Sequence, residues 1–131
     1  MVWTMLAKLP QYYRSLARWL FLPALAIVMW GELKPSTHGP EAIWDKVLHF
    51  AAYFGLAGIA TIALGRRKAS FWAAFALAVF GGILEIVQSF VGRDAEWGDE
   101  VANVIGVCLG CAGAWLTLRI VDGLATRRQS N

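Results

Sequence analysis

Charged residues are scarce in this chain. They make up 16% of its 131 residues, whereas apolar residues make up 58%, and the mean hydropathy is positive. Soluble domains carry about 25% charged residues, so this composition argues against a water-soluble fold and indicates one that is solvated by lipid. Cysteine is also rare, because only Cys108 and Cys111 are present. They lie in an apolar run without a nearby histidine or second cysteine pair, so we interpret them as packing residues and not as a redox or metal motif.

Four apolar stretches approach the length of a membrane span, which is about 17 to 25 residues for an apolar helix. The first stretch reaches this length only if it extends back through Leu16, with Arg18 reaching toward the lipid headgroups. We predict an all-α fold, an integral membrane bundle of four transmembrane helices joined by short loops. The predicted spans cover residues 19–33, 47–64, 71–91 and 101–121 of the domain 19–121.

The first apolar stretch has two interpretations. Basic residues precede it, as they do in a secretory signal peptide, but no small-residue cleavage motif follows Trp30. We favour a retained span, and a cleaved signal is the alternative. Residues 1–18 mix aromatic, leucine and basic side chains, which predicts an amphipathic segment on the membrane surface that Pro10 splits into two short pieces.

The distribution of charge indicates how the bundle is oriented. Nine of the twelve basic residues lie on the side of the N-terminus or at the helix ends on that side, and loops rich in Lys and Arg face the cytoplasm. Seven of the nine acidic residues lie in or beside the two loops on the other side. We therefore predict cytoplasmic N- and C-termini, with residues 122–131 as a polar tail. The net charge of +3 then reflects topology and does not predict nucleic-acid binding.

Polar residues at helical spacing gather near the outer ends of the last three spans. In each span two of them are three or four positions apart, so they share one helix face. Because ionisable groups at membrane depth are costly, we predict that they form one outward-facing polar pocket. The candidate pocket residues are Asp45, Lys46 and His49 in the second span, Glu85 and Gln88 in the third, Arg93 and Asp94 in the following loop, and Asp99 and Asn103 in the fourth.

Glu85 is the deepest member of this cluster. At a rise of about 1.5 Å per residue it lies roughly 9 Å below the outer end of its span, where an unpaired carboxylate costs on the order of 3 kcal/mol. We therefore expect Glu85 to face the bundle interior and to pair with a basic side chain. Helix capping and interfacial ion pairing are the competing interpretation for the aspartates. The candidate partners of Glu85 are Lys46, His49 and Arg93, and if none of them reaches it we expect the Glu85 carboxyl group to be neutral at pH 7, because desolvation favours the uncharged form.

The motifs around these residues resemble the VanZ-like family of small bacterial membrane proteins. They read D-K-V-L-H-F from Asp45, E-I-V-Q from Glu85, then Arg93, and D-E-V-A-N-V-I-G from Asp99, and the resemblance covers about residues 45–110. It implies a multi-pass protein of the bacterial cytoplasmic membrane and cell envelope. The family is named for a member associated with low-level resistance to the glycopeptide antibiotic teicoplanin.

Two functions fit such a pocket. The favoured one is non-catalytic binding of a membrane lipid, a lipid-linked cell-wall intermediate, or a glycopeptide or lipopeptide antibiotic. In this binding function, Arg93 and Lys46 would bind a phosphate group of the ligand, and the acidic residues would bind an amine or hydroxyl group. The alternative is an intramembrane enzyme acting on a lipid headgroup, with His49 or Glu85 as general base and Arg93 stabilising developing negative charge.

Other partners are less well supported by the sequence. We predict no cofactor and no metal, because one histidine with oxygen donors on separate helices is a weak metal signature. A transporter is disfavoured because no polar stripe runs to the inner side. Small residues at helical spacing, such as Gly106 and Gly110, suit a homo-oligomer, but we favour tight packing within one chain.

Overall fold

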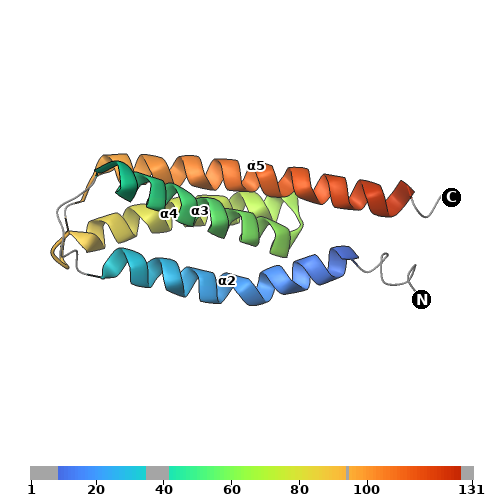
Figure 1. The fold of residues 1–131 in the computed structure, drawn as a ribbon, viewed down its shortest axis with the longest axis horizontal. Helices are drawn as coiled ribbons and strands as arrows, with labels where there is room; N and C mark the ends of the chain where they lie inside the picture. The colour runs from blue at the N-terminus through green and yellow to red at the C-terminus, as the bar shows by residue number, and fades with distance from the viewer. Residues whose placement is uncertain (1–8, 35–41, 94, 128–131) are drawn as a thin grey trace.

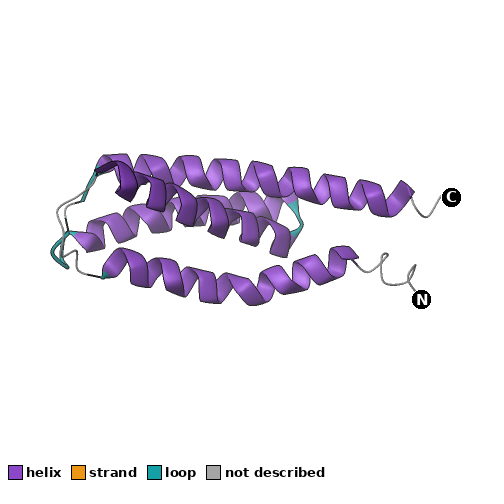
Figure 2. Cartoon of the chain, in the orientation of Figure 1, coloured by secondary structure: helices purple, strands orange, loops and turns teal. Residues whose placement is uncertain are grey.

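The computed structural model describes residues 9–34, 42–93 and 95–127. This part of the chain is helical apart from short connections (Figure 2), and all four helices are long and apolar enough to cross a membrane. The predicted all-α fold with four candidate membrane spans is confirmed for the described residues. The helices are α2 (Leu9–Leu33), α3 (Ala42–Leu64), α4 (Arg67–Gln88) and α5 (Trp97–Arg127), each antiparallel to the next (Figure 1).

The helices extend beyond the apolar stretches. Helix α2 begins at Leu9, so residues 9–18 continue directly into the span. Pro10 lies in the first turn of α2 as described, where its missing N–H leaves no helical hydrogen bond unmade, and the predicted split at Pro10 concerns residues that lie partly outside the described chain. Residues 1–8 lie outside the described chain. At the other terminus, α5 continues to Arg127, into the region expected to be a polar tail.

Helices α3 and α5 form the most extensive contact in the bundle, and α2 packs mainly on α3. Glycines on α5 allow this close approach. A Cβ atom at Gly106 would lie 2.5 Å from the carbonyl oxygen of Phe50, and one at Gly110 would overlap the carbonyl oxygen of Phe54. These small residues therefore serve helix packing within the chain.

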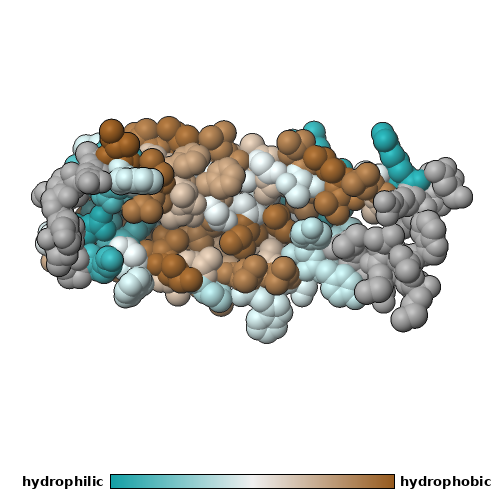
Figure 3. All heavy atoms as spheres, in the orientation of Figure 1, coloured by the Kyte–Doolittle hydropathy of each residue, from teal (hydrophilic) through white to brown (hydrophobic). Residues whose placement is uncertain are grey.

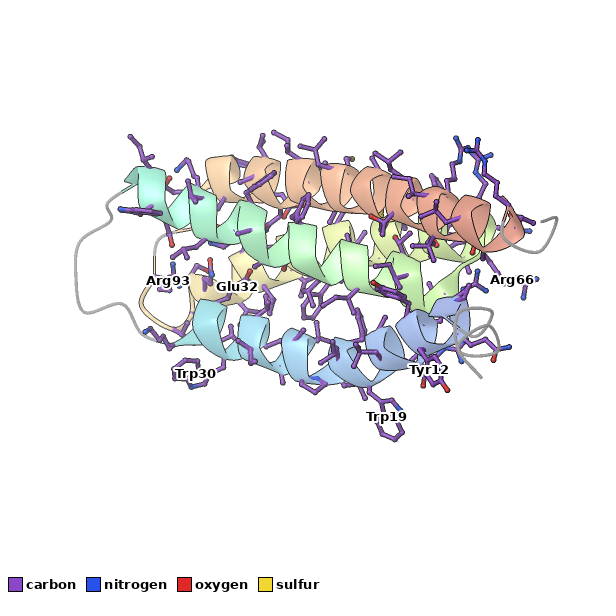
Figure 4. The ribbon with its side chains drawn as sticks, turned by 45° about the vertical axis from the view of Figure 1, so that its right-hand side comes forward. Tyr12, Trp19, Trp30, Glu32, Arg66 and Arg93 are labelled. Atoms are coloured by element: carbon purple, nitrogen blue, oxygen red, sulfur yellow. The ribbon has the colours of Figure 1, made fainter. Side chains whose placement is uncertain are left out.

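The interior of the bundle is apolar in its middle. Tyr53, Leu56 and Leu77 are among the buried residues that pack together there. Large apolar side chains also cover the outside, as the hydrophobic belt in Figure 3 shows. Trp19 is 80% exposed and Trp30 69%, and both project away from the bundle (Figure 4). Such an exterior suits lipid as the surrounding solvent.

One end of the bundle is polar, and we call it the polar end. It is formed where α2 and α4 end and where α3 and α5 begin, on the left of Figure 1, and hydrophilic atoms gather there in Figure 3. The buried polar residues of this end are Glu32, His49, Glu85, Gln88, Asp99 and Asn103.

Candidate functional site

The structure describes eight of the nine residues that the sequence predicts for the pocket, and all eight lie at the polar end. Asp94 is outside the described residues. Glu85, His49 and Asp99 are buried with Gln88 and Asn103, and the other three are partly buried. The residues are not equivalent, because some hold the helices together and others face open space.

Arg93 holds the end of α2 against α3. Its Nη2 donates to both carboxylate oxygens of Asp45, at 3.1 and 3.0 Å, and its Nη1 donates to the backbone carbonyl of Glu32 at 3.1 Å. Gln88 Nε2 donates to the same carbonyl, also at 3.1 Å. The last carbonyls of a helix have no partner within the helix, so these two side chains satisfy the end of α2 and fix Glu32 in position.

Lys46 is paired with acidic groups at the start of α5. Its Nζ lies 2.6 Å from Glu96 Oε2 and 3.4 Å from Asp99 Oδ1. The Lys46 and Glu96 side chains are 37% and 40% exposed, so their ion pair adds little stability. The pairing nevertheless affects the electrostatics of the site. The positive charges of Lys46 and Arg93 are both neutralised by neighbouring carboxylates.

His49 is oriented by a chain of hydrogen bonds. Its Nδ1 lies 3.2 Å from Asn103 Oδ1, and Asn103 Nδ2 donates to Glu100 Oε2 at 3.2 Å. Asn103 therefore presents its oxygen to the imidazole, and we assign the proton to Nδ1. This leaves Nε2 directed toward Asp99, with 3.9 Å between Nε2 and Oδ2.

Glu85 faces the interior, as expected, but its partner differs from the expected cation. Its Oε1 accepts a short hydrogen bond from the backbone N–H of Glu96, and no described residue forms an ion pair with it. The expected pairing with Lys46, His49 or Arg93 is therefore wrong, because the first turn of α5 and its preceding loop offer unpaired amides close to α4. Glu85 acts as a structural acceptor between these elements.

Sequence reasoning missed Glu32 as a member of the site. It is 7% exposed, its Oε1 lies 3.5 Å from His49 Nδ1, and neither carboxylate oxygen has a hydrogen-bond partner among the described residues. Glu32 follows an apolar run directly and precedes Lys34, so it reads as a solvated acid at a helix end. One signal could have identified Glu32. It lies one residue before the end of the first span, at the same end of the bundle as Asp45.

A pocket of about 420 Å³ opens between α2 and α3 beside these residues. Its apolar wall lies deeper in the bundle, and its polar wall lies nearer the helix ends. Figure 4 shows Glu32 and Arg93 on this side of the polar end. The lining residues are Ile27, Val28, Gly31, Leu48 and Ala52 on the apolar wall, and Glu32, Lys34, Asp45, His49 and Arg93 on the polar wall.

The polar wall combines a buried acid, Glu32, with two basic side chains, Lys34 and Arg93. Arg93 is paired with Asp45, and Lys34 places its Nζ over the ring of Trp30, 5.4 Å from the ring centroid. The Glu32 carboxylate, in contrast, is buried without a hydrogen-bonding partner in the described structure. Leaving a buried carboxylate unsatisfied is costly, so the pocket favours a ligand with hydrogen-bond donors and positive charge.

Comparisons with known proteins do not assign a function, so the function proposed below is inferred from the chemistry of the site. No protein-family model, no curated protein and no solved structure matches this chain.

Proposed function

We propose that this protein is a VanZ-like integral protein of the bacterial cytoplasmic membrane that binds an amphiphile carrying a primary amine, with the amine at Glu32. The observation that supports this most directly is the buried Glu32 carboxylate without a hydrogen-bond partner among the described residues, on the wall of an open pocket. The resemblance of residues 45–110 to the VanZ-like family supports the same assignment.

The two walls of the pocket suit an amphiphile. Ile27, Leu48 and Ala52 line its deeper part, where the apolar part of a headgroup would lie. Its volume of about 420 Å³ falls within the usual range for small-molecule sites, which is about 300 to 1,000 Å³. The pocket therefore has room for a headgroup, and the acyl chains would remain on the apolar outside of the bundle.

The buried Glu32 carboxylate favours an amine over a phosphate at this point of the pocket. The sequence-based expectation that Arg93 and Lys46 meet phosphate requires both to be available, but both are paired with acids. An ammonium group has three hydrogen-bond donors, enough to satisfy both oxygens of Glu32. An aminophospholipid and an amine-bearing lipopeptide or glycopeptide antibiotic share this chemistry.

The polar end is proposed to face away from the cytoplasm. Basic residues cluster at the opposite end of the bundle, where Arg18 Nε donates to the carbonyl of Ala63 at 3.2 Å. Arg66 lies there in the connection between α3 and α4, and Arg67 and Lys68 begin α4. Loops rich in basic residues remain on the cytoplasmic side. The pocket then opens to the outer leaflet, where envelope lipids and extracellular antibiotics reach it.

The test compares two lipids that differ only in the amine. The purified protein in detergent is incubated with equal amounts of phosphatidylethanolamine and N-acetyl-phosphatidylethanolamine, and the retained lipid is measured by native mass spectrometry. We expect retention of the free amine and about tenfold weaker binding by Glu32→Gln, which corresponds to about 1.4 kcal/mol. Asp122→Asn, an exposed acid on α5 far from the polar end, is the matched control and should bind normally.

Two results would contradict this proposal. Equal retention of both lipids would show that the amine is not recognised. Release of a cleaved lipid product would instead support the alternative, an intramembrane enzyme with His49 as general base. Glu85 is a weaker candidate for that role, because its Oε1 is occupied by the Glu96 amide.

A further inference from the structure

The polar end also contains a set of metal-ligand side chains that amine binding at Glu32 does not use. We infer that His49, Asp45 and Asp99 bind a divalent transition-metal ion, with Zn²⁺ as the probe of choice. This inference does not depend on the proposed function, although both concern the polar end and share the pocket that His49 and Asp45 line.

The donor atoms are close enough to share one ion. One donor atom from each of the three residues lies within 4.8 Å of the others. Donors at about 2.0 to 2.2 Å from a tetrahedral Zn²⁺ are about 3.3 to 3.6 Å apart, so side-chain movements that shorten the longest separation by about 1.2 to 1.5 Å bring all three onto the ion. Asp45 and His49 are four residues apart on α3 and share one face, and Asp99 comes from the first turn of α5.

His49 has the orientation of a metal ligand. Its Nδ1 is held by Asn103 Oδ1 at 3.2 Å, so its Nε2 carries the lone pair on the side of Asp99. Histidine ligands usually donate their second ring N–H to an oxygen acceptor in this way, which fixes the tautomer and the ring. Asn103 is fixed in turn by Glu100.

Buried acids around His49 have oxygens without hydrogen-bond partners among the described residues. The Asp99 side chain is 3% exposed, and its Oδ1 accepts no hydrogen bond from the described residues, although Lys46 Nζ lies 3.4 Å away. The Glu32 side chain is 9% exposed, its two oxygens are likewise unpartnered, and it lines the same pocket as Asp45 and His49. A bound cation would offset the cost of burying these carboxylates.

The remaining contacts are compatible with an ion. Arg93 Nη2 donates to both oxygens of Asp45, but a carboxylate has about four lone-pair sites, and metal-bound carboxylates are often hydrogen-bonded as well. The donors are one imidazole nitrogen and carboxylate oxygens without a thiolate. This set suits Zn²⁺ or Mn²⁺ and excludes a preference for Cu(I).

The metal alone tests this inference. The full chain is purified in detergent without added amphiphile, stripped with a chelator, and titrated with Zn²⁺ by calorimetry. We expect one Zn²⁺ per chain, with affinity at least tenfold lower in Asp99→Asn and in His49→Ala. His38→Ala, which removes the only other histidine of the chain, is the matched control and should bind as the wild type does.

X-ray absorption at the zinc edge reports the ligands of the bound ion directly, so this measurement does not depend on the behaviour of the variants. The wild-type protein should show a single imidazole together with oxygen ligands and no sulfur. Two imidazoles or a sulfur ligand would overturn the inference, and so would wild-type affinity no higher than that of the two site variants. Absent binding would show that His49 and its acids are only a structural ion network. Because no amphiphile is present, these results leave the proposed amine binding untouched.

Discussion

Arg93 and Asp45 form the ion pair that closes the polar end, with one guanidinium nitrogen donating to both oxygens of the carboxylate at 3.1 and 3.0 Å. The same guanidinium reaches the carbonyl of Glu32 through its other terminal nitrogen. One side chain thus fixes the distance between α2 and α3 and determines the shape of the pocket between them.

Arg93→Lys should weaken this connection although it keeps the charge. A lysine has one ammonium group and cannot reproduce the two-pronged contact with Asp45 and the Glu32 carbonyl. We expect a loss of about 1 to 3 kcal/mol in unfolding free energy, measured by thermal or denaturant unfolding in detergent. In a double-mutant cycle with Asp45→Asn, the two losses should not add, and strictly additive losses would show that the pair does not act as a unit.

Gln88 should be required for its amide N–H and not for its size. Its side chain is 1% exposed and donates to the Glu32 carbonyl. Gln88→Glu removes the donor and adds a buried charge, so we expect it to destabilise the protein more than Gln88→Met, which costs about 1 to 3 kcal/mol. Unfolding curves of the two variants measure the difference, and equal stability would refute this role.

Glu85 should tolerate glutamine but not alanine. A glutamine carbonyl still accepts the hydrogen bond from the Glu96 amide, whereas alanine leaves that amide without its acceptor, at a cost of about 1 to 3 kcal/mol. We expect Glu85→Gln to bind the amine-bearing lipid within about twofold of wild type, a free-energy difference under 1 kcal/mol. A complete loss of function in a stable Glu85→Gln protein would instead support a general-base role.

Gly110→Ala should force α3 and α5 apart. The added Cβ would overlap the carbonyl oxygen of Phe54, and overpacking of this kind costs about 1 to 3 kcal/mol or more. Gly113→Ala is the matched control on the same helix, because its Cβ would meet only Phe54 Cζ at 4.0 Å. The prediction fails if the two variants have the same unfolding temperature.

The proposed orientation can be tested with single cysteines in a chain that lacks Cys108 and Cys111. Trp97 is 88% exposed at the polar end, and Gly123 is exposed near the other end of α5. On intact cells, a membrane-impermeant maleimide should label Trp97→Cys and spare Gly123→Cys. The reverse labelling would place the pocket on the cytoplasmic side.

The helices and the local polar pairs were predictable from the sequence, because both depend on short-range patterns. Apolar length predicts the spans, and the spacing of Asp45 and His49 places them on one face of α3. The helix ends were harder to place, because polar residues such as Arg14 and Asp122 remain helical beyond the apolar stretch.

The partners of the polar residues were not predictable in the same way. Gln88 and Arg93 both bind a backbone carbonyl, that of Glu32, and any residue at that position would provide one. Glu85 likewise accepts from a backbone N–H. Glu32 is separated from α3 by a loop, so only the packed bundle shows that it faces His49. The proposed metal ligands, Asp45 and His49 on α3 and Asp99 on α5, are likewise brought together only by helix packing.

The most direct test of the central claim is an experimental structure of the protein in nanodiscs that contain phosphatidylethanolamine. The account predicts headgroup density in the pocket between α2 and α3, with the amine nitrogen about 3 Å from the Glu32 carboxylate and Arg93 still bound to Asp45. A headgroup whose phosphate displaces Asp45 from Arg93, or an ordered lipid elsewhere with this pocket closed, would contradict it.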